Sequence, residues 1–94
     1  MQQNGINTQL NLSKKYLLAI RYNTPEISCK VLLGEARKHL ALACDLANKY
    51  EQWKIAQIYK AINKNCTGKE VMTAKKNAIN GINEMLSIKV VQRA

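Results

Sequence analysis

The sequence contains few side chains whose type and spacing would support catalysis. Its single histidine, His39, lies four residues after Glu35, so on a helix the carboxylate could orient the imidazole as a general base. No serine, cysteine or second acid is spaced to converge on this pair through local geometry. We therefore interpret the two residues as a helix-surface pair, and the sequence predicts neither a catalytic residue nor an enzyme.

Patterns that bind metals or phosphate cofactors are also missing. The three cysteines, Cys29, Cys44 and Cys66, form no Cys-x-x-Cys pair, and the six carboxylates are scattered. If Cys29 and Cys44 share one helix they lie about 22 Å apart, too far for a common metal or disulfide, and we expect buried free thiols. Thr67-Gly68-Lys69 lacks the earlier glycine of a phosphate loop and, with Glu70, predicts a helix-capping box. No metal or cofactor is predicted.

Positive charge is the strongest property of the whole chain. The 94 residues include 15 Lys and Arg against 6 Asp and Glu, which gives a net charge of +9. Such a charge attracts nucleic acid, anionic lipid or acidic protein surfaces. Only Arg21, Arg37 and Arg93 are arginines, and lysine lacks the forked geometry that reads guanine. Nucleic-acid binding thus remains one alternative, beside lysines that serve only to solvate the surface.

Length and composition favour one small helical domain over residues 1–94. Apolar residues make up 47% of the chain, and four glycines with one proline are too few for a turn-rich β fold. No apolar run approaches the ~20 residues that cross a bilayer, and the Asn- and Gln-rich start lacks the features of a signal peptide. We expect a cytoplasmic protein whose residues 1–7 form a flexible tail.

The spacing of apolar residues predicts four helices, at about 9–22, 25–49, 51–63 and 68–91, joined by short loops. This pattern is typical of an all-α, antiparallel, up-and-down four-helix bundle. Thr8 is the expected N-cap of the first helix and Thr24 that of the second, which Pro25 would begin. The apolar stripe expected on the first helix comprises Leu12, Tyr16, Leu17, Ala19 and Ile20.

The second predicted helix carries a seam of small and apolar residues at alternating intervals of three and four. The seam comprises Leu33, Ala36, Leu40, Ala43, Ala47 and Tyr50. Its register breaks near residues 48–52, where we expect a turn with Asn48 in the left-handed conformation. Gly34 is interpreted as a close-packing point or a weak spot. Trp53 is expected to anchor the core, with a partly exposed contact at the helix corner as the alternative.

The last predicted helix has two contrasting faces. One is apolar, with Val71, Ala74, Ala78, Ile79, Ile82, Met85, Leu86 and Val90. The opposite face is polar, with Lys69, Thr73, Lys76, Asn80, Asn83 and Ser87 at intervals of four and three. The polar face is the candidate surface for a partner.

Residues Tyr59–Met85 resemble the corresponding part of cytosolic immunity proteins against pediocin-like bacteriocins. The resemblance rests on Tyr59, Ile62, Lys69, Thr73-Ala74-Lys75-Lys76-Asn77 and Ile82-Asn83-Glu84-Met85, although Lys75-Lys76 stands where an acidic pair is expected. It implies a four-helix bundle that protects the producer cell by binding a membrane permease–bacteriocin complex from the cytosolic side. On this hypothesis the partner-binding residues are Lys69, Lys76, Asn80, Asn83, Lys89 and Arg93.

Two other functions compete with this one. The first is a small phage- or plasmid-type protein that binds nucleic acid through its lysines. The second is a homodimeric helical adaptor with the small-residue seam of the second helix as its interface. A location at the inner face of the membrane is compatible with the charge, because Lys14, Lys15 and Arg21 flank the apolar stripe of the first helix.

Overall fold

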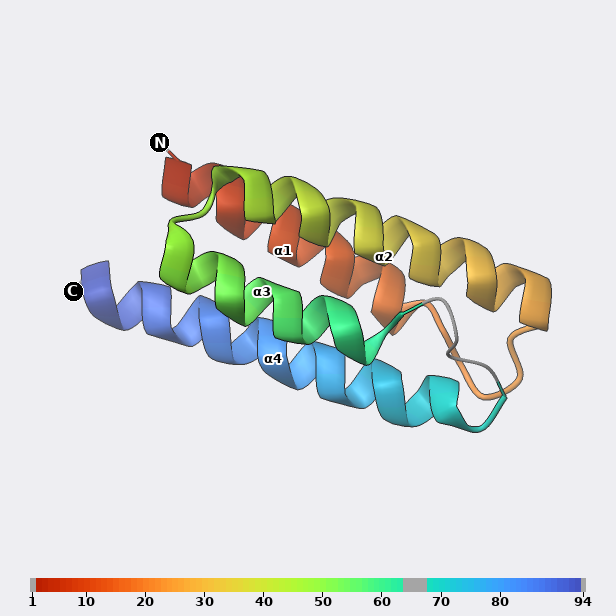
Figure 1. Cartoon of the computed structure of the whole chain (residues 1–94). Helices are drawn as coiled ribbons and strands as arrows, with labels where there is room; N and C mark the ends of the chain where they lie inside the picture. Colours follow the sequence, from red (N-terminus) through yellow and green to blue (C-terminus); the bar gives the residue numbers. More distant parts are fainter. Residues whose placement is uncertain (1, 64–67, 94) are drawn as a thin grey trace.

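The computed structural model describes residues 2–63 and 68–93, with side chains described for residues 5–63 and 68–87. Four helices, α1 (Gln2–Leu18), α2 (Glu26–Leu46), α3 (Lys49–Ala61) and α4 (Glu70–Arg93), pack side by side in a bundle of 40 × 21 × 18 Å. Each helix packs against the one before it, and α4 returns against α1 (Figure 1). The predicted all-α up-and-down four-helix bundle is confirmed.

The described core is aliphatic, and every helix contributes to it. Its buried members are Ile6, Leu10, Leu17, Ile20, Leu33, Ala36, Leu40, Ala43, Ile55, Ile58, Ile62, Val71, Ala74, Ala78, Ile82 and Met85. Burying one large aliphatic side chain contributes about 1.5–3 kcal/mol to folding, so this shared core holds the four helices together. Within the described part of the chain, no helix is long and apolar enough to cross a membrane.

The beginning of the chain differs from the prediction. Residues 1–7 were expected to be a flexible tail, but α1 begins at Gln2 and Ile6 is 98% buried beside Leu10. Ile6 lies four residues before Leu10, so the two share one helix face. Leu46 of α2 packs closely against Gly5. A Cβ added to Gly5 would lie 3.1 Å from Cδ1 of Leu46. The Asn- and Gln-rich composition of this segment led to the prediction of a tail, although Ile6 is an apolar residue of the core. Thr8, the predicted N-cap, lies inside the helix.

The buried face of α1 is also rotated from the predicted one. Ser13 lies in the middle of this face and is fully buried. Its hydroxyl donates a 2.9 Å hydrogen bond to the carbonyl oxygen of Ala36 on α2. The serine interrupts the apolar spacing of this face, so the spacing predicts a different apolar stripe. In that stripe Leu12 and Tyr16 are only half-buried, and Ala19 is exposed. The observed buried residues of α1 are Ile6, Leu10, Ser13 and Leu17, followed by Ile20 beyond its end.

The α1–α2 connection uses Thr24 differently from the predicted cap. The Thr24 hydroxyl accepts a 2.8 Å hydrogen bond from the Arg21 amide, and the Thr24 amide donates to the Arg21 carbonyl at 2.9 Å. These bonds close a turn between the helices. The residue that precedes α2 is Pro25, which has no side-chain cap. α1 ends at Leu18, four residues before Tyr22, where the first helix was predicted to end.

Most of the predicted seam lies inside the bundle, although Ala47 is only half-buried and Tyr50 is exposed on α3. Leu33, Ala36, Leu40 and Ala43 are buried, and α2 makes its most extensive contact with α1. The alanines among them let α1 approach, and these four seam residues are therefore not available as the interface of a homodimer.

The predicted break between the second and third helices is confirmed. α2 ends at Leu46 and α3 begins at Lys49. Asn48 does not adopt the left-handed conformation, however, because it is the N-cap of α3 (φ −77°, ψ 174°). Its side chain accepts from the Glu51 amide at 2.9 Å, and the Glu51 carboxylate accepts from the Asn48 amide at 3.1 Å. The turn is thus specified by a capping box that starts α3.

Two glycines in helices have contrasting surroundings. An added Cβ on Gly81 of α4 would lie 2.7 Å from Cγ1 of Ile58 on α3, so at Gly81 the two helices pack too closely for a larger side chain. At Gly34 an added Cβ would meet only the Arg37 guanidinium at 3.9 Å, so Gly34 is not a close-packing point.

Before α4, Gly68 has a φ of +60°, and α4 begins at Glu70, two residues after the predicted start. Thr67 of the predicted capping box lies outside the described residues.

Candidate functional site

The polar face predicted on the last helix is the outer face of α4. The buried residues of this helix, such as Ala78 and Ile82, face the other helices, whereas Lys69, Lys76, Asn80 and Asn83 are all exposed. Intervals of four and three residues place Lys76, Asn80 and Asn83 on the same side of α4, and Lys69 lies just before the helix begins at Glu70. The side chains of Lys89 and Arg93 lie outside the described residues.

The structure brings only some of the predicted residues together. Lys76 and Asn80 line one hollow of about 480 Å³ with Met72, Thr73, Lys75 and Ile79. Lys69 lies instead at a hollow of about 510 Å³, where the end of α3 meets the start of α4, together with Asn63, Glu70, Thr73 and Asn77. Asn83 lines neither hollow. The lysine and amide groups can bind an acidic or carbonyl-rich surface, and Met72 and Ile79 supply apolar contact area.

Lysine 75, which stands where an acidic residue is expected from the family resemblance, contacts α1. Its ammonium group donates a hydrogen bond to the carbonyl oxygen of Ile20, just beyond the end of α1. Arg37 of α2 does the same for α3, donating to the Ile62 carbonyl at 2.8 Å. A cation at a helix C-terminus satisfies a free carbonyl and interacts favourably with the helix dipole. Part of the positive charge therefore serves the fold, which sequence spacing could not reveal because the partners are 55 and 25 residues apart.

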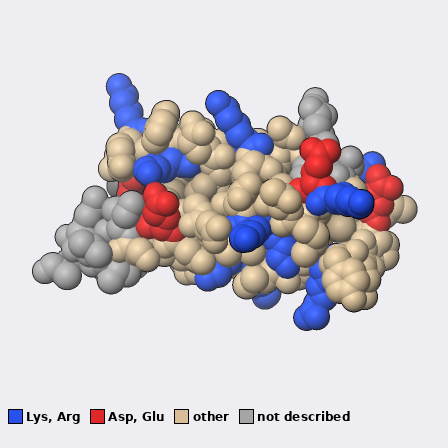
Figure 2. Space-filling view, turned by 90° about the horizontal axis from the view of Figure 1, so that it is seen from below, with Lys and Arg blue, Asp and Glu red and all other residues tan. Residues whose placement is uncertain are grey.

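Basic side chains are spread widely over the surface. Figure 2 shows them separated by uncharged residues, with the acidic side chains grouped toward the two ends of that face. One acidic residue, Glu84 of α4, pairs with Lys54 of α3 at 3.2 Å. This dispersed pattern gives general attraction to anions and does not by itself define one binding site.

His39 has a structural environment different from the predicted one. Its Nδ1 atom lies 2.6 Å from Oε1 of Gln9 on α1, and its ring stacks on Tyr16 with the centroids 5.6 Å apart. These contacts hold His39 at the α1–α2 interface, where it is half-buried. In the described residues it is therefore not the surface pair with Glu35 that the spacing suggested.

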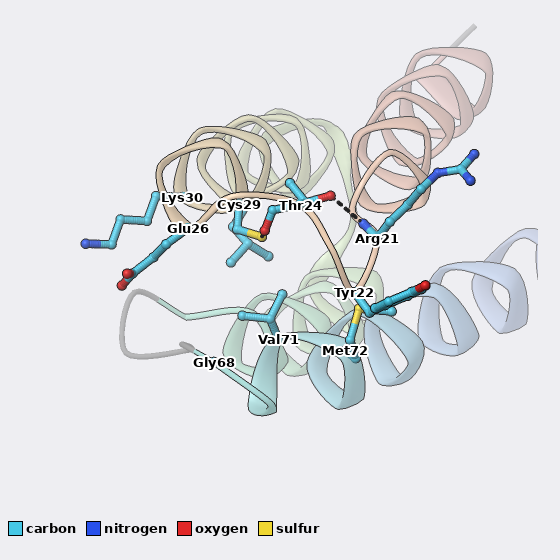
Figure 3. A pocket seen from close by; sticks show the side chains of 10 residues that line it. Arg21, Tyr22, Thr24, Glu26, Cys29, Lys30, Gly68, Val71 and Met72 are labelled. Atoms are coloured by element: carbon cyan, nitrogen blue, oxygen red, sulfur yellow. Dashed lines mark hydrogen bonds between the residues drawn. The ribbon is translucent and has the colours of Figure 1, made fainter.

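A cavity of about 410 Å³ lies at the end of the bundle where α2 and α4 begin. Cys29 and Val71 point into it, whereas Arg21 and Lys30 extend away from it (Figure 3). The Cys29 thiol lies 3.6 Å from the Thr24 carbonyl and is half-buried, as is Cys44 near the other end of α2. Both are free thiols, as predicted, but neither is fully buried; Cys66 lies outside the described residues.

The sequence prediction placed Trp53 in the core, and this is wrong. Trp53 is 59% exposed, as is Tyr50 one turn earlier on α3. The spacing of residues in the sequence could have shown the exposure of Trp53, because Trp53 lies on the side of α3 opposite the buried Ile55 and Ile58. The alternative expectation, a partly exposed side chain at the helix corner, is the one that the structure supports.

Among the described residues, no three His, Cys, Asp or Glu side chains lie close enough together to hold a metal ion. The outer face of α4 is exposed, and so are Tyr50 and Trp53 on α3. No protein-family model, no curated protein and no solved structure matches this chain.

Proposed function

We propose that this protein works without catalysing a reaction, by binding a partner protein through the outer face of α4, and that it is a cytoplasmic immunity protein against pediocin-like bacteriocins. The observation that carries the proposal is the exposure of Lys76, Asn80 and Asn83 on one side of α4, with Lys69 exposed just before the helix. These residues take no part in the described core, so the bundle leaves them available for a partner.

The chemistry of this face suits a protein surface. Lysine ammonium groups donate to carboxylates, and asparagine amides both donate and accept hydrogen bonds. The hollow beside Lys76 and Asn80 adds Met72 and Ile79 as apolar contact area. Apolar contact surrounded by polar groups is the usual composition of a protein–protein interface. Lys89 and Arg93 would add electrostatic attraction near the end of the same helix.

The mechanism implied by the resemblance to immunity proteins is a shift in an equilibrium. The partner would be the complex of a sugar-uptake permease with the bacteriocin at the inner face of the membrane. To protect the cell, the bundle must bind the closed form of that complex more tightly than the pore, because a ligand shifts an equilibrium only by its difference in affinity.

A protection assay tests the proposal. The chain is expressed in a strain sensitive to pediocin-like bacteriocins, and survival is measured against a panel of these peptides. We expect survival to rise for at least one peptide and to fall back for the Lys76→Ala/Asn80→Ala variant. The matched control, Lys38→Ala/Asn11→Ala, alters exposed residues of the same types on α2 and α1 and should still protect. A folded wild-type chain that protects against no peptide of the panel contradicts the proposal.

A further inference from the structure

The outer surface of α3 combines aromatic and basic side chains in an arrangement that the bundle core does not require. Lys49, Trp53, Ala56 and Lys60 follow one another at intervals of four, three and four residues, and all four are exposed. They therefore lie in a line on one side of the helix, about 16 Å from end to end. Tyr50 is exposed beside Trp53. These five residues are called the α3 stripe.

Exposure of aromatic rings is a general property of this chain. The sequence has four tyrosines, one tryptophan and no phenylalanine, so every aromatic side chain carries a polar atom. Four of the five, Tyr22, Tyr50, Trp53 and Tyr59, are exposed, and three of these belong to α3. Rings with an apolar body and an N–H or O–H group are favoured at the boundary between water and an apolar phase.

Basic side chains flank the rings of the α3 stripe. Lys49 lies one turn before Trp53, Lys60 lies two turns after it, and α3 as a whole has three lysines and one glutamate. Lys54, whose ammonium is 5.9 Å from the Trp53 ring centroid, is already paired with Glu84. Lysine stems can lie along apolar material while the charged ends remain in water. The complementary surface is therefore anionic at its boundary and apolar beneath.

We propose that the α3 stripe docks onto an anionic lipid bilayer. α3 lies parallel to the membrane plane, the rings of Trp53 and Tyr50 enter the headgroup layer, and Lys49 and Lys60 contact anionic headgroups. A lipid surface offers both the charge and the apolar layer over the whole length of the stripe. The proposal is independent of the immunity function, since the stripe and the outer face of α4 belong to different helices.

Trp53 reports on this contact directly because it is the only tryptophan in the sequence. The full chain is titrated with vesicles of equal parts phosphatidylglycerol and phosphatidylcholine, and separately with vesicles of pure phosphatidylcholine. We expect a blue shift of Trp53 emission and protection from acrylamide quenching with the anionic vesicles only. Absence of a blue shift with anionic vesicles overturns the proposal, whatever the protection assay shows.

Charge variants separate docking of the stripe from general attraction. Lys49→Gln/Lys60→Gln should weaken partitioning to the anionic vesicles by about 25-fold, since one lysine near such a surface contributes about fivefold. The matched control, Lys30→Gln/Lys38→Gln, removes the same charge from exposed positions of α2 and should weaken it by less than about fivefold. Equal losses in the two pairs overturn the proposal.

Two further measurements use the same proteins. Trp53→Ala, followed by co-sedimentation with the anionic vesicles, should bind more weakly than Tyr22→Ala, which removes an exposed ring from the α1–α2 connection. A single-stranded oligonucleotide at near-physiological salt should leave Trp53 emission unchanged. If the oligonucleotide alters the emission and displaces the vesicles, the stripe binds nucleic acid and the lipid proposal is wrong.

Discussion

At the scale of single residues, Gly34 and Gly81 occupy the same kind of helical position with opposite consequences. Gly34 lies in α2 with open space around it, because an added methyl group would meet only the Arg37 side chain at 3.9 Å. Alanine is better than glycine in a helix by about 1 kcal/mol. Gly34→Ala should therefore raise the free energy of unfolding by up to about 1 kcal/mol and the melting temperature by about 4–8 °C. Urea unfolding followed by circular dichroism measures this.

Gly81→Ala should have the opposite effect. Its Cβ would lie 2.7 Å from Cγ1 and 3.2 Å from Cδ1 of Ile58, and a β-branched side chain has few other rotamers to adopt. Overpacking costs about 1–3 kcal/mol, more than the helix propensity returns, so we expect a net loss of stability. A Gly81→Ala protein that unfolds at the same urea concentration as Gly34→Ala would show that α3 and α4 do not pack as closely as the structure has them.

At the scale of helices, α3 is the shortest and its two ends are fixed by different parts of the chain. Asn48 and Glu51 cap its first turn reciprocally, and Arg37 of α2 binds the Ile62 carbonyl at its end. Asn48→Ala removes the side-chain acceptor at the first turn and should lower the free energy of unfolding by about 1 kcal/mol. Asn48→Asp retains the acceptor and should unfold close to wild type. Equal stability of the two variants in thermal unfolding would argue against the cap.

The first turns of α1 belong to the folded bundle, and isoleucine truncation tests this. Ile6 is 98% buried, whereas Ile27 at the start of α2 is 79% exposed. Ile6→Ala should lower the free energy of unfolding by about 2 kcal/mol or more because it leaves a cavity. The same truncation at Ile27 should change it by less than about 0.5 kcal/mol. If Ile6→Ala were as stable as Ile27→Ala in urea, residues 1–7 would be the tail expected from composition.

At the scale of the whole molecule, a net charge of +9 predicts general attraction to polyanions. The basic groups are dispersed, and Arg37 and Lys75 bind backbone carbonyls of the bundle. We expect labelled DNA and RNA oligomers to bind weakly at low salt and to dissociate near physiological salt, with a steep dependence on salt concentration. Fluorescence anisotropy at two salt concentrations measures this. Tight binding that persists at physiological salt and prefers one nucleic acid would instead favour the nucleic-acid function.

The general architecture follows from the sequence alone. Apolar residues at intervals of three and four identify α2 and α4, and four of the six predicted seam residues, Leu33, Ala36, Leu40 and Ala43, are buried in α2. The shift of register near residues 48–52 identifies the break before α3. These features are local, because a helix of 3.6 residues per turn brings such positions to one face whatever it packs against. The polar face of α4, with Lys76 and Asn80, is exposed for the same reason.

Only the tertiary structure decided which polar groups find a partner inside the bundle. Ser13 can lie in the core because its hydroxyl donates a hydrogen bond to the Ala36 carbonyl, 23 residues away. The spacing of apolar residues does not show this partner, so the apolar face predicted for α1 differs from the face that is buried. Lys75 likewise donates a hydrogen bond to the carbonyl oxygen of Ile20, 55 residues away in the sequence. A buried polar atom needs a partner, and its partner is found by folding rather than by spacing.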